Sequence, residues 1–98
     1  MPRSEIDRIR EKIRLRQYDM SAHAMEEMAE AMLTILDVEE AVLSGQVIRV
    51  EKDDPRGTKY IVVGTALDQQ TPVGIVGRFA SNGRYLIITV YEVTKLEG

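Results

Sequence analysis

Residues 46–64 read QVIRVEKDDPRGTKYIVVG and mark the point where a helical pattern gives way to a strand pattern. The two apolar runs in this stretch, 47–50 and 60–63, are rich in β-branched residues, which favour extended strands. Between them, Asp54-Pro55-Arg56-Gly57 places proline and glycine at positions that a type I turn favours. Because a parallel connection needs a dozen or more residues, so short a turn predicts an antiparallel hairpin.

Two more β-branched runs, 73–76 and 85–91, follow this hairpin. A polar connection over residues 67–72 precedes the first of them, and Asn82-Gly83, a strong signal for a tight hairpin, separates the two. Both connections are again too short for a parallel crossover. The C-terminal half therefore predicts a four-stranded antiparallel meander.

Helical spacing dominates the residues before the strands. A first helix follows a capping pattern at Ser4 and continues through Gln17. A second helix starts at Ser21, and a third follows a capping box at Thr34 and ends at Gly45. We therefore expect an α+β fold in which three N-terminal helices pack on one face of the meander sheet.

Charge is distributed unevenly along the chain. Residues 1–17 carry six basic and three acidic side chains, for a charge of +3, whereas residues 18–54 carry −8 and residues 55–98 carry +2. A chain of 98 residues has apolar surface for one core, so we expect residues 18–98 to form a single α+β domain and residues 1–17 a basic helix docked at its periphery. The net charge of −3 disfavours nonspecific binding to nucleic acid but leaves a local basic face open.

The chain contains one histidine, His23, and no cysteine. Disulfides and thiolate metal sites are thereby excluded, and His23 has no second histidine four residues away, so we expect no metal site and no cofactor. His23 is the side chain best suited to move a proton near neutral pH. The alternative is a surface histidine bound to a nearby carboxylate or backbone group.

The second helix carries an apolar arc. On a helical wheel this arc holds Ala24, Met28, Ala31 and Met32, and we expect its methionines to fill the core. An adaptable groove for a partner protein is the alternative for a methionine stripe.

The last strand predicts a candidate binding patch. Thr89 and Tyr91, with Arg78 or Arg84 from nearby, could hold a phosphate or an oxyanion. The alternative is an ordinary half-exposed sheet face, since such faces commonly mix hydroxyls with aliphatic side chains. Strict alternation places Leu86, Ile88 and Val90 on a core face, and Tyr85, Ile87, Thr89 and Tyr91 on the other.

A set of spaced residues resembles a known bacterial family. They are Tyr18-x-x-Ser21-x-His23-Ala24-x-x-x-Met28, Ile35-x-Asp37-Val38, Asp54-Pro55-Arg56-Gly57 and Ile87-Ile88-Thr89-Val90-Tyr91, in that order. Together they resemble domain-of-unknown-function family 4258 over about residues 18–93. Members of that family commonly show an arginine followed by a glycine where this chain has Ala31-Met32.

The resemblance implies distant kinship with RelE-like and barnase-like ribonuclease toxins. The chain would then be a metal-independent ribonuclease of toxin type, with His23, Thr89 and Tyr91 as catalytic candidates and Arg78 or Arg84 on the phosphate. Its partners would be RNA or an antitoxin-like protein. A non-catalytic interaction or oligomerisation module, assembling with a partner or a second copy, is the alternative, so whether the chain is an enzyme stays open.

Hydropathy predicts no contact with a membrane. No apolar run approaches the roughly 20 residues of a membrane span, and the first residues lack an apolar signal core. We therefore expect a cytoplasmic protein.

Overall fold

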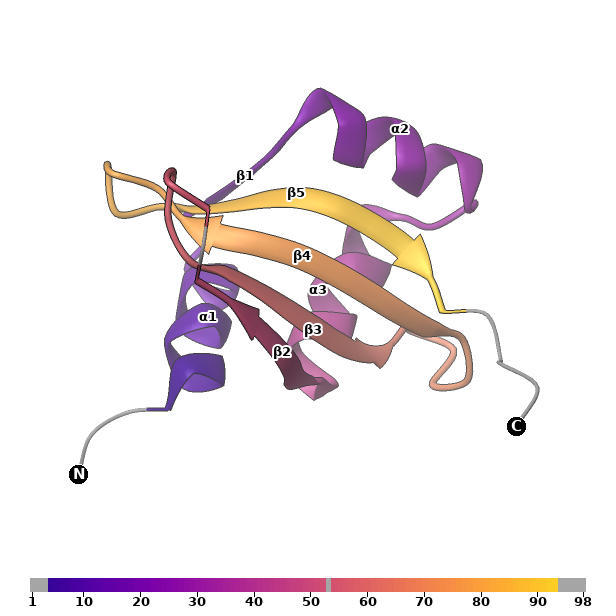
Figure 1. The fold of residues 1–98 in the computed structure, drawn as a ribbon. Coiled ribbons are helices and arrows are strands. Elements are labelled where there is room, and N and C mark those ends of the chain that lie inside the picture. Colours follow the sequence, from indigo (N-terminus) through magenta and orange to yellow (C-terminus); the bar gives the residue numbers. More distant parts are fainter. Residues whose placement is uncertain (1–3, 53, 94–98) are drawn as a thin grey trace.

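A computed structural model describes residues 4–52 and 54–93 (Figure 1). Within these residues, three helices, with one short strand after the first of them, precede four consecutive strands. The elements are α1 (Glu5–Arg14), β1 (Tyr18–Met20), α2 (Ala22–Glu30), α3 (Ile35–Ser44), β2 (Gln46–Glu51), β3 (Lys59–Thr65), β4 (Pro72–Phe79) and β5 (Tyr85–Glu92).

The sheet has five strands in the order β1-β5-β4-β3-β2. The antiparallel meander from β2 to β5 is confirmed, and so is the α+β class with three helices. The prediction of four strands was wrong, because β1 pairs in parallel with the start of β5. A strand of three residues between two helices is too short to show a period of its own, so only the distant partner strand reveals it.

Helices α1 and α3 pack on one face of the sheet, behind it in Figure 1. Their inward side chains are fully buried, among them Ile9 and Ile13 from α1 and Val38 and Val42 from α3. The first helix is thus part of the main core and not a peripheral attachment. Helix α2 lies instead beside β5, along the border of the sheet.

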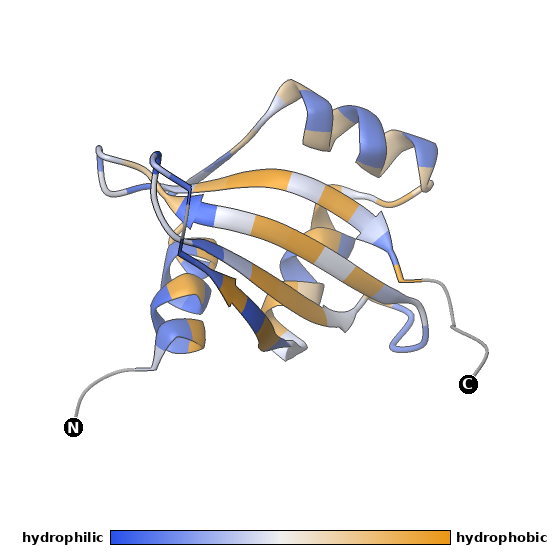
Figure 2. Cartoon of the chain, in the orientation of Figure 1, coloured by the Kyte–Doolittle hydropathy of each residue, from blue (hydrophilic) through white to orange (hydrophobic). Residues whose placement is uncertain are grey.

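Glycine allows α3 to approach the sheet closely. A Cβ atom at Gly64 of β3 would lie 1.9 Å from the carbonyl oxygen of Ala41 in α3. Only a residue without a side chain fits between strand and helix there. Figure 2 shows apolar bands across the middle of β3, β4 and β5, with polar residues in the connecting turns.

Two helices end in a left-handed residue that is not glycine. Arg16 follows α1 with a φ of 57°, and Met32 follows α2 with a φ of 59°. The N–H groups of Met32 and Leu33 donate to the carbonyls of Ala29 and Met28, the Schellman pattern. Helix α2 ends at Glu30, so Met32 lies beyond the helix and its side chain is 88% exposed. The prediction that Met32 fills the core was therefore wrong. Ala24, on the same predicted arc, is fully buried.

Candidate functional site

A β-bulge in β5 decides which side chains can form a surface site. Val76 of β4 pairs with Thr89, but the next residue, Gly77, pairs with Ile87, so Ile88 is the extra residue. Alternation therefore reverses at Ile88. The face assignment predicted from strict alternation was right for Val90, Thr89 and Tyr91 but wrong before the bulge: Tyr85 and Ile87 are buried on the helix side, and Leu86, paired with Arg78, lies on the other.

We call the side of the sheet opposite α1 and α3 the open face. Directly paired residues share a face, so two rows across the strands belong to it. Arg78 stands two positions after Val76 on β4 and therefore shares this face with Thr89 and Tyr91. The first row, from β2 to β5, consists of Arg49, Ile61, Val76 and Thr89. The second row, in the same order, consists of Gln46, Val63, Gly74 and Tyr91.

The two candidate arginines are in different situations. Arg84 donates from Nε to Oδ2 of Asp19 at 2.8 Å and from Nη2 to the carbonyl of Tyr18 at 3.0 Å, which ties the β4–β5 hairpin to β1. Its hydrogen bond lowers the pKa of the Asp19 carboxyl. Arg78 forms no ion pair within the described residues, so its guanidinium remains available to an anion.

The only histidine is held beside β5 by a carboxylate. His23 Nε2 lies 3.1 Å from Oε2 of Glu27, one helical turn further along α2. The other oxygen of that carboxylate, Oε1, accepts the backbone N–H of Val90 at 3.0 Å. Val90 stands between Thr89 and Tyr91 in the chain, so the structure brings His23 to the same stretch of β5 as the two hydroxyl candidates.

Ser21 completes the junction between α2 and β5. Its Oγ caps the helix by accepting the N–H of Ala24 and donates to the carbonyl of the bulged Ile88 at 3.0 Å. Its own N–H donates to Ile87, continuing the β1 pairing by one residue. The spacing of Ser21 and Glu27 therefore serves to dock one helix on the free side of a strand.

The arrangement of His23 and Glu27 suits proton transfer. A carboxylate on one ring nitrogen orients the imidazole, and the other nitrogen, which has no hydrogen-bond partner among the described residues, can face a substrate. The His23 side chain is 65% exposed, so a substrate can reach it. Sequence reasoning allowed for a nearby carboxylate on His23 but missed the bond of that carboxylate to β5, which only the docking of α2 on a distant strand reveals.

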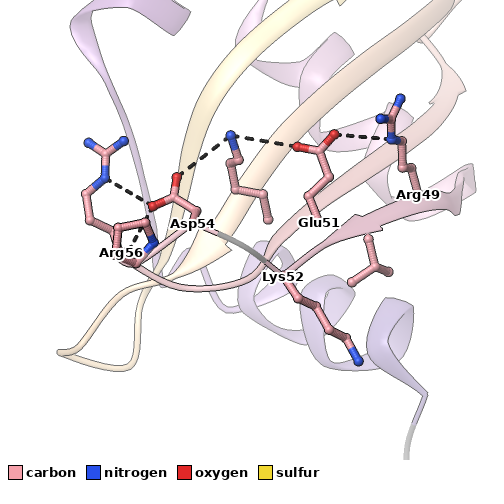
Figure 3. Close-up of a pocket in the computed structure, with 8 residues that line it drawn as sticks. Arg49, Glu51, Lys52, Asp54 and Arg56 are labelled. Atoms are coloured by element: carbon pink, nitrogen blue, oxygen red, sulfur yellow. Dashed lines mark hydrogen bonds and ion pairs between the residues drawn. The ribbon is translucent and has the colours of Figure 1, made fainter.

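A hollow of about 830 Å³ lies at the β2–β3 hairpin (Figure 3). Sequence reasoning used this stretch for its turn alone, although its charges were visible. A chain of ion pairs crosses the hollow, from Arg49 through Glu51, Lys59 and Asp54 to Arg56 (Figure 3). The N–H and the side chain of Arg56 lower the pKa of the Asp54 carboxyl. The lining residues are Arg49, Val50, Glu51, Lys52, Asp54, Pro55, Arg56 and Lys59.

A second carboxylate contact lies on the helix side. The hydroxyl of Tyr18 donates to Glu39 of α3 in a short hydrogen bond, and Arg16 lies 3.9 Å from the same carboxylate. Burial, followed by the bond to Glu39, raises the pKa of Tyr18 well above its usual range. This contact anchors β1 to α3.

Across residues 4–52 and 54–93, no group of three or more His, Asp or Glu side chains is placed to hold a metal ion. No helix in the described part of the chain is long and apolar enough to cross a membrane.

Comparison with known sequences identifies one family. The sequence model described as "domain of unknown function (DUF4258)" matches residues 20–92, which include α2, α3 and strands β2 to β5. No curated protein and no solved structure matches the chain.

Proposed function

The chain belongs to the DUF4258 family, and we propose that it is a small RelE-like ribonuclease module of toxin type that works without a metal. One observation carries the proposal: Glu27 links the only histidine to the backbone of β5 between Thr89 and Tyr91. A proton-transfer group oriented by a fixed carboxylate is the usual core of a hydrolytic site.

The chemistry can be written with these residues. The free nitrogen of His23 takes the proton of a ribose 2′-hydroxyl, whose oxygen attacks the adjacent phosphorus, and Glu27 stabilises the imidazolium. The bond to the 5′-oxygen breaks, and a hydroxyl of Tyr91 or a water molecule protonates that oxygen. The products are a 2′,3′-cyclic phosphate and a free 5′-hydroxyl. Thr89 would stabilise the charge on the phosphorane through a hydrogen bond, and Arg78, whose side chain points toward the β2–β3 hairpin, would hold a neighbouring phosphate.

Single substitutions on one helix test this mechanism. Purified protein and its His23→Ala and Glu27→Gln variants are incubated with total RNA and with ribosome-bound RNA in the presence of EDTA. Loss of general acid–base catalysis should slow cleavage about 10²- to 10⁴-fold in His23→Ala. Glu26→Gln, an exposed neighbour on α2, is the matched control and should keep full activity. Equal decay of RNA in wild type and His23→Ala would remove His23 from the mechanism.

A protein-interaction module is the second candidate, favoured by an exposed apolar cluster. Leu67 donates its N–H to Asp37 in the first turn of α3, which brings it to the helix start beside Ile35 and Leu36. Met32, Ile35, Leu36 and Leu67 are exposed by 88%, 40%, 50% and 53%. Such a group could dock an antitoxin-like protein or a second copy. Light scattering of wild type and Leu36→Asp tests the second copy, and a wild type that is monomeric at high concentration excludes it.

A further inference from the structure

We propose that the RNA this site takes is single-stranded, with one unpaired base stacked on the ring of Tyr91 and the neighbouring phosphates held by the basic β2–β3 hairpin. This rests on the proposed function for the identity of the ligand. It adds the binding surface and the strandedness of the substrate.

The Tyr91 ring lies on the sheet because its cross-strand partner is a glycine. A Cβ atom at Gly74 would fall 2.2 Å from Cζ of Tyr91 and 2.5 and 2.6 Å from Cε2 and Cε1. The ring therefore occupies the space directly above the Gly74 backbone. Tyr91 nevertheless remains partly exposed. An aromatic ring supported from below by backbone is a rigid platform on which a base can stack.

The surroundings of this platform are apolar and uncovered by helix. Ile61, Val63 and Val76 stand on the open face and are all partly exposed, although α1 and α3 pack on the opposite face. An unpaired base can lie across such a surface and gain stacking and apolar contact. A base in a duplex is already stacked and paired, so it cannot use the Tyr91 ring.

The charge needed for the phosphates lies at the other end of the same face. Gly74 and Arg78 are four residues apart on β4, which corresponds to about 13 Å along a strand. The side chain of Arg78 points toward the hairpin, since its Cδ lies 3.8 Å from where a Cβ of Gly57 would stand. The Tyr91 platform and the hairpin are thus joined by one strand.

The hairpin end carries an excess of positive charge. Four cations line the hollow, and Arg78 adds a fifth, against the carboxylates of Glu51 and Asp54. The excess remains even if Asp53, a further acidic residue in the sequence of this hairpin, is counted. Arg78 stands on the open face and has no ion pair within the described residues, whereas the side chain of Lys52 points away from the chain of ion pairs (Figure 3). A polyanion is the ligand that complements this charge.

Fluorescence anisotropy with labelled oligonucleotides tests the proposal. All proteins carry His23→Ala so that the probe is not cleaved. The probes are an RNA of about 12 nucleotides, its duplex, and an abasic strand of equal length that keeps the phosphates. Tyr91→Leu should weaken binding of the RNA about 5- to 100-fold and leave binding of the abasic strand unchanged. Tyr91→Phe keeps the ring and should bind as tightly as the parent.

Two further variants separate charge from stacking. Arg78→Ala should weaken binding of the RNA and of the abasic strand alike, and lower the salt dependence of log K by about 0.7. Arg14→Ala removes one exposed positive charge from α1, on the opposite face, and should change neither quantity. Thermal unfolding of each variant shows whether its fold is intact.

The outcomes distinguish this inference from the proposed function. Equal losses on RNA and abasic strand in Tyr91→Leu, or no loss at all, would overturn the stacking platform even if wild type cleaves RNA through His23. Conversely, suppose that RNA binding depends on Tyr91 while RNA decay is equal in wild type and His23→Ala. That result would support the stacking platform and overturn the proposed catalysis. Duplex binding as tight as single-strand binding, or no RNA binding at all, overturns the inference.

Discussion

Glu27 accepts the backbone N–H of Val90 through Oε1 at 3.0 Å, and this bond ties helix α2 to the C-terminal half of strand β5. Val90 is 1% exposed, and its N–H is satisfied by this carboxylate. The same carboxylate orients His23. One side chain thus serves both the docking of α2 and the candidate site.

Removing the Glu27 carboxylate should weaken the junction between α2 and β5. Glu27→Ala leaves the Val90 N–H without an acceptor, which costs about 1–3 kcal/mol of the free energy of unfolding. Glu27→Gln keeps an oxygen acceptor and should cost less. Urea unfolding gives the stability, and hydrogen exchange at the Val90 amide reports the local opening. Slow exchange of that amide in Glu27→Ala would contradict the role of this bond.

Asp37 should make stability depend on pH in the acid range. Its carboxylate accepts hydrogen bonds from the N–H of Thr34 and the N–H of Leu67, and these lower its pKa below the usual value. The folded state therefore gains stability above the unfolded pKa of about 4, and loses it as pH falls through the lower folded pKa.

Asp37→Asn tests this by urea unfolding across that pH range. The variant should lose stability above the unfolded pKa and show a flatter acid limb than wild type. Glu40→Gln, on the same helix, should keep the wild-type acid limb. If Asp37→Asn lost stability at acid pH as steeply as wild type, the pH dependence would arise from a group other than Asp37.

Met32→Gly should stabilise the protein. Met32 has a φ of 59°, a conformation that costs an L-residue about 1–2 kcal/mol, and its exposed side chain offers little packing in return. Glycine adopts this φ without strain, but it also makes the unfolded chain more flexible, which favours unfolding. The net gain in the free energy of unfolding should therefore be about 0.5–1 kcal/mol.

Thermal unfolding measures the Met32→Gly effect, with Met25→Gly inside α2 as the reverse control. That control should destabilise by about 1 kcal/mol, because glycine is a poor helix former. A destabilised Met32→Gly would mean that the exposed methionine packs against something in solution.

Tyr85→Phe should be neutral or stabilising. The Tyr85 side chain is fully buried, and its hydroxyl has no hydrogen-bond partner among residues 4–52 and 54–93. Removing an unpaired buried hydroxyl recovers its desolvation cost, about 1–3 kcal/mol at most. Tyr18→Phe is the matched control and should destabilise, since it removes the bond to Glu39. Chemical unfolding of both variants decides, and a clear loss of stability in Tyr85→Phe would contradict the prediction.

Much of the meander and of the helix starts followed from sequence. Ser21 and Thr34 cap their helices as predicted, and the turn at Asp54 is closed by the N–H of Gly57. The sequence also singles out the candidate residues His23, Arg78, Thr89 and Tyr91. What sequence could not supply was their common geometry, because the register between β4 and β5 depends on a bulge that alternation does not show.

The sequence by itself determined the local features: the helix caps, the tight turns and the change from helical to strand period near Gln46. These depend on residues a few positions apart, whose preferences act before the chain folds. Tertiary structure alone decided three others, namely the parallel pairing of β1 with β5, the reversal of faces at Ile88, and the contact of Glu27 with Val90. Each joins segments far apart in the chain, so packing of the whole core had to select it.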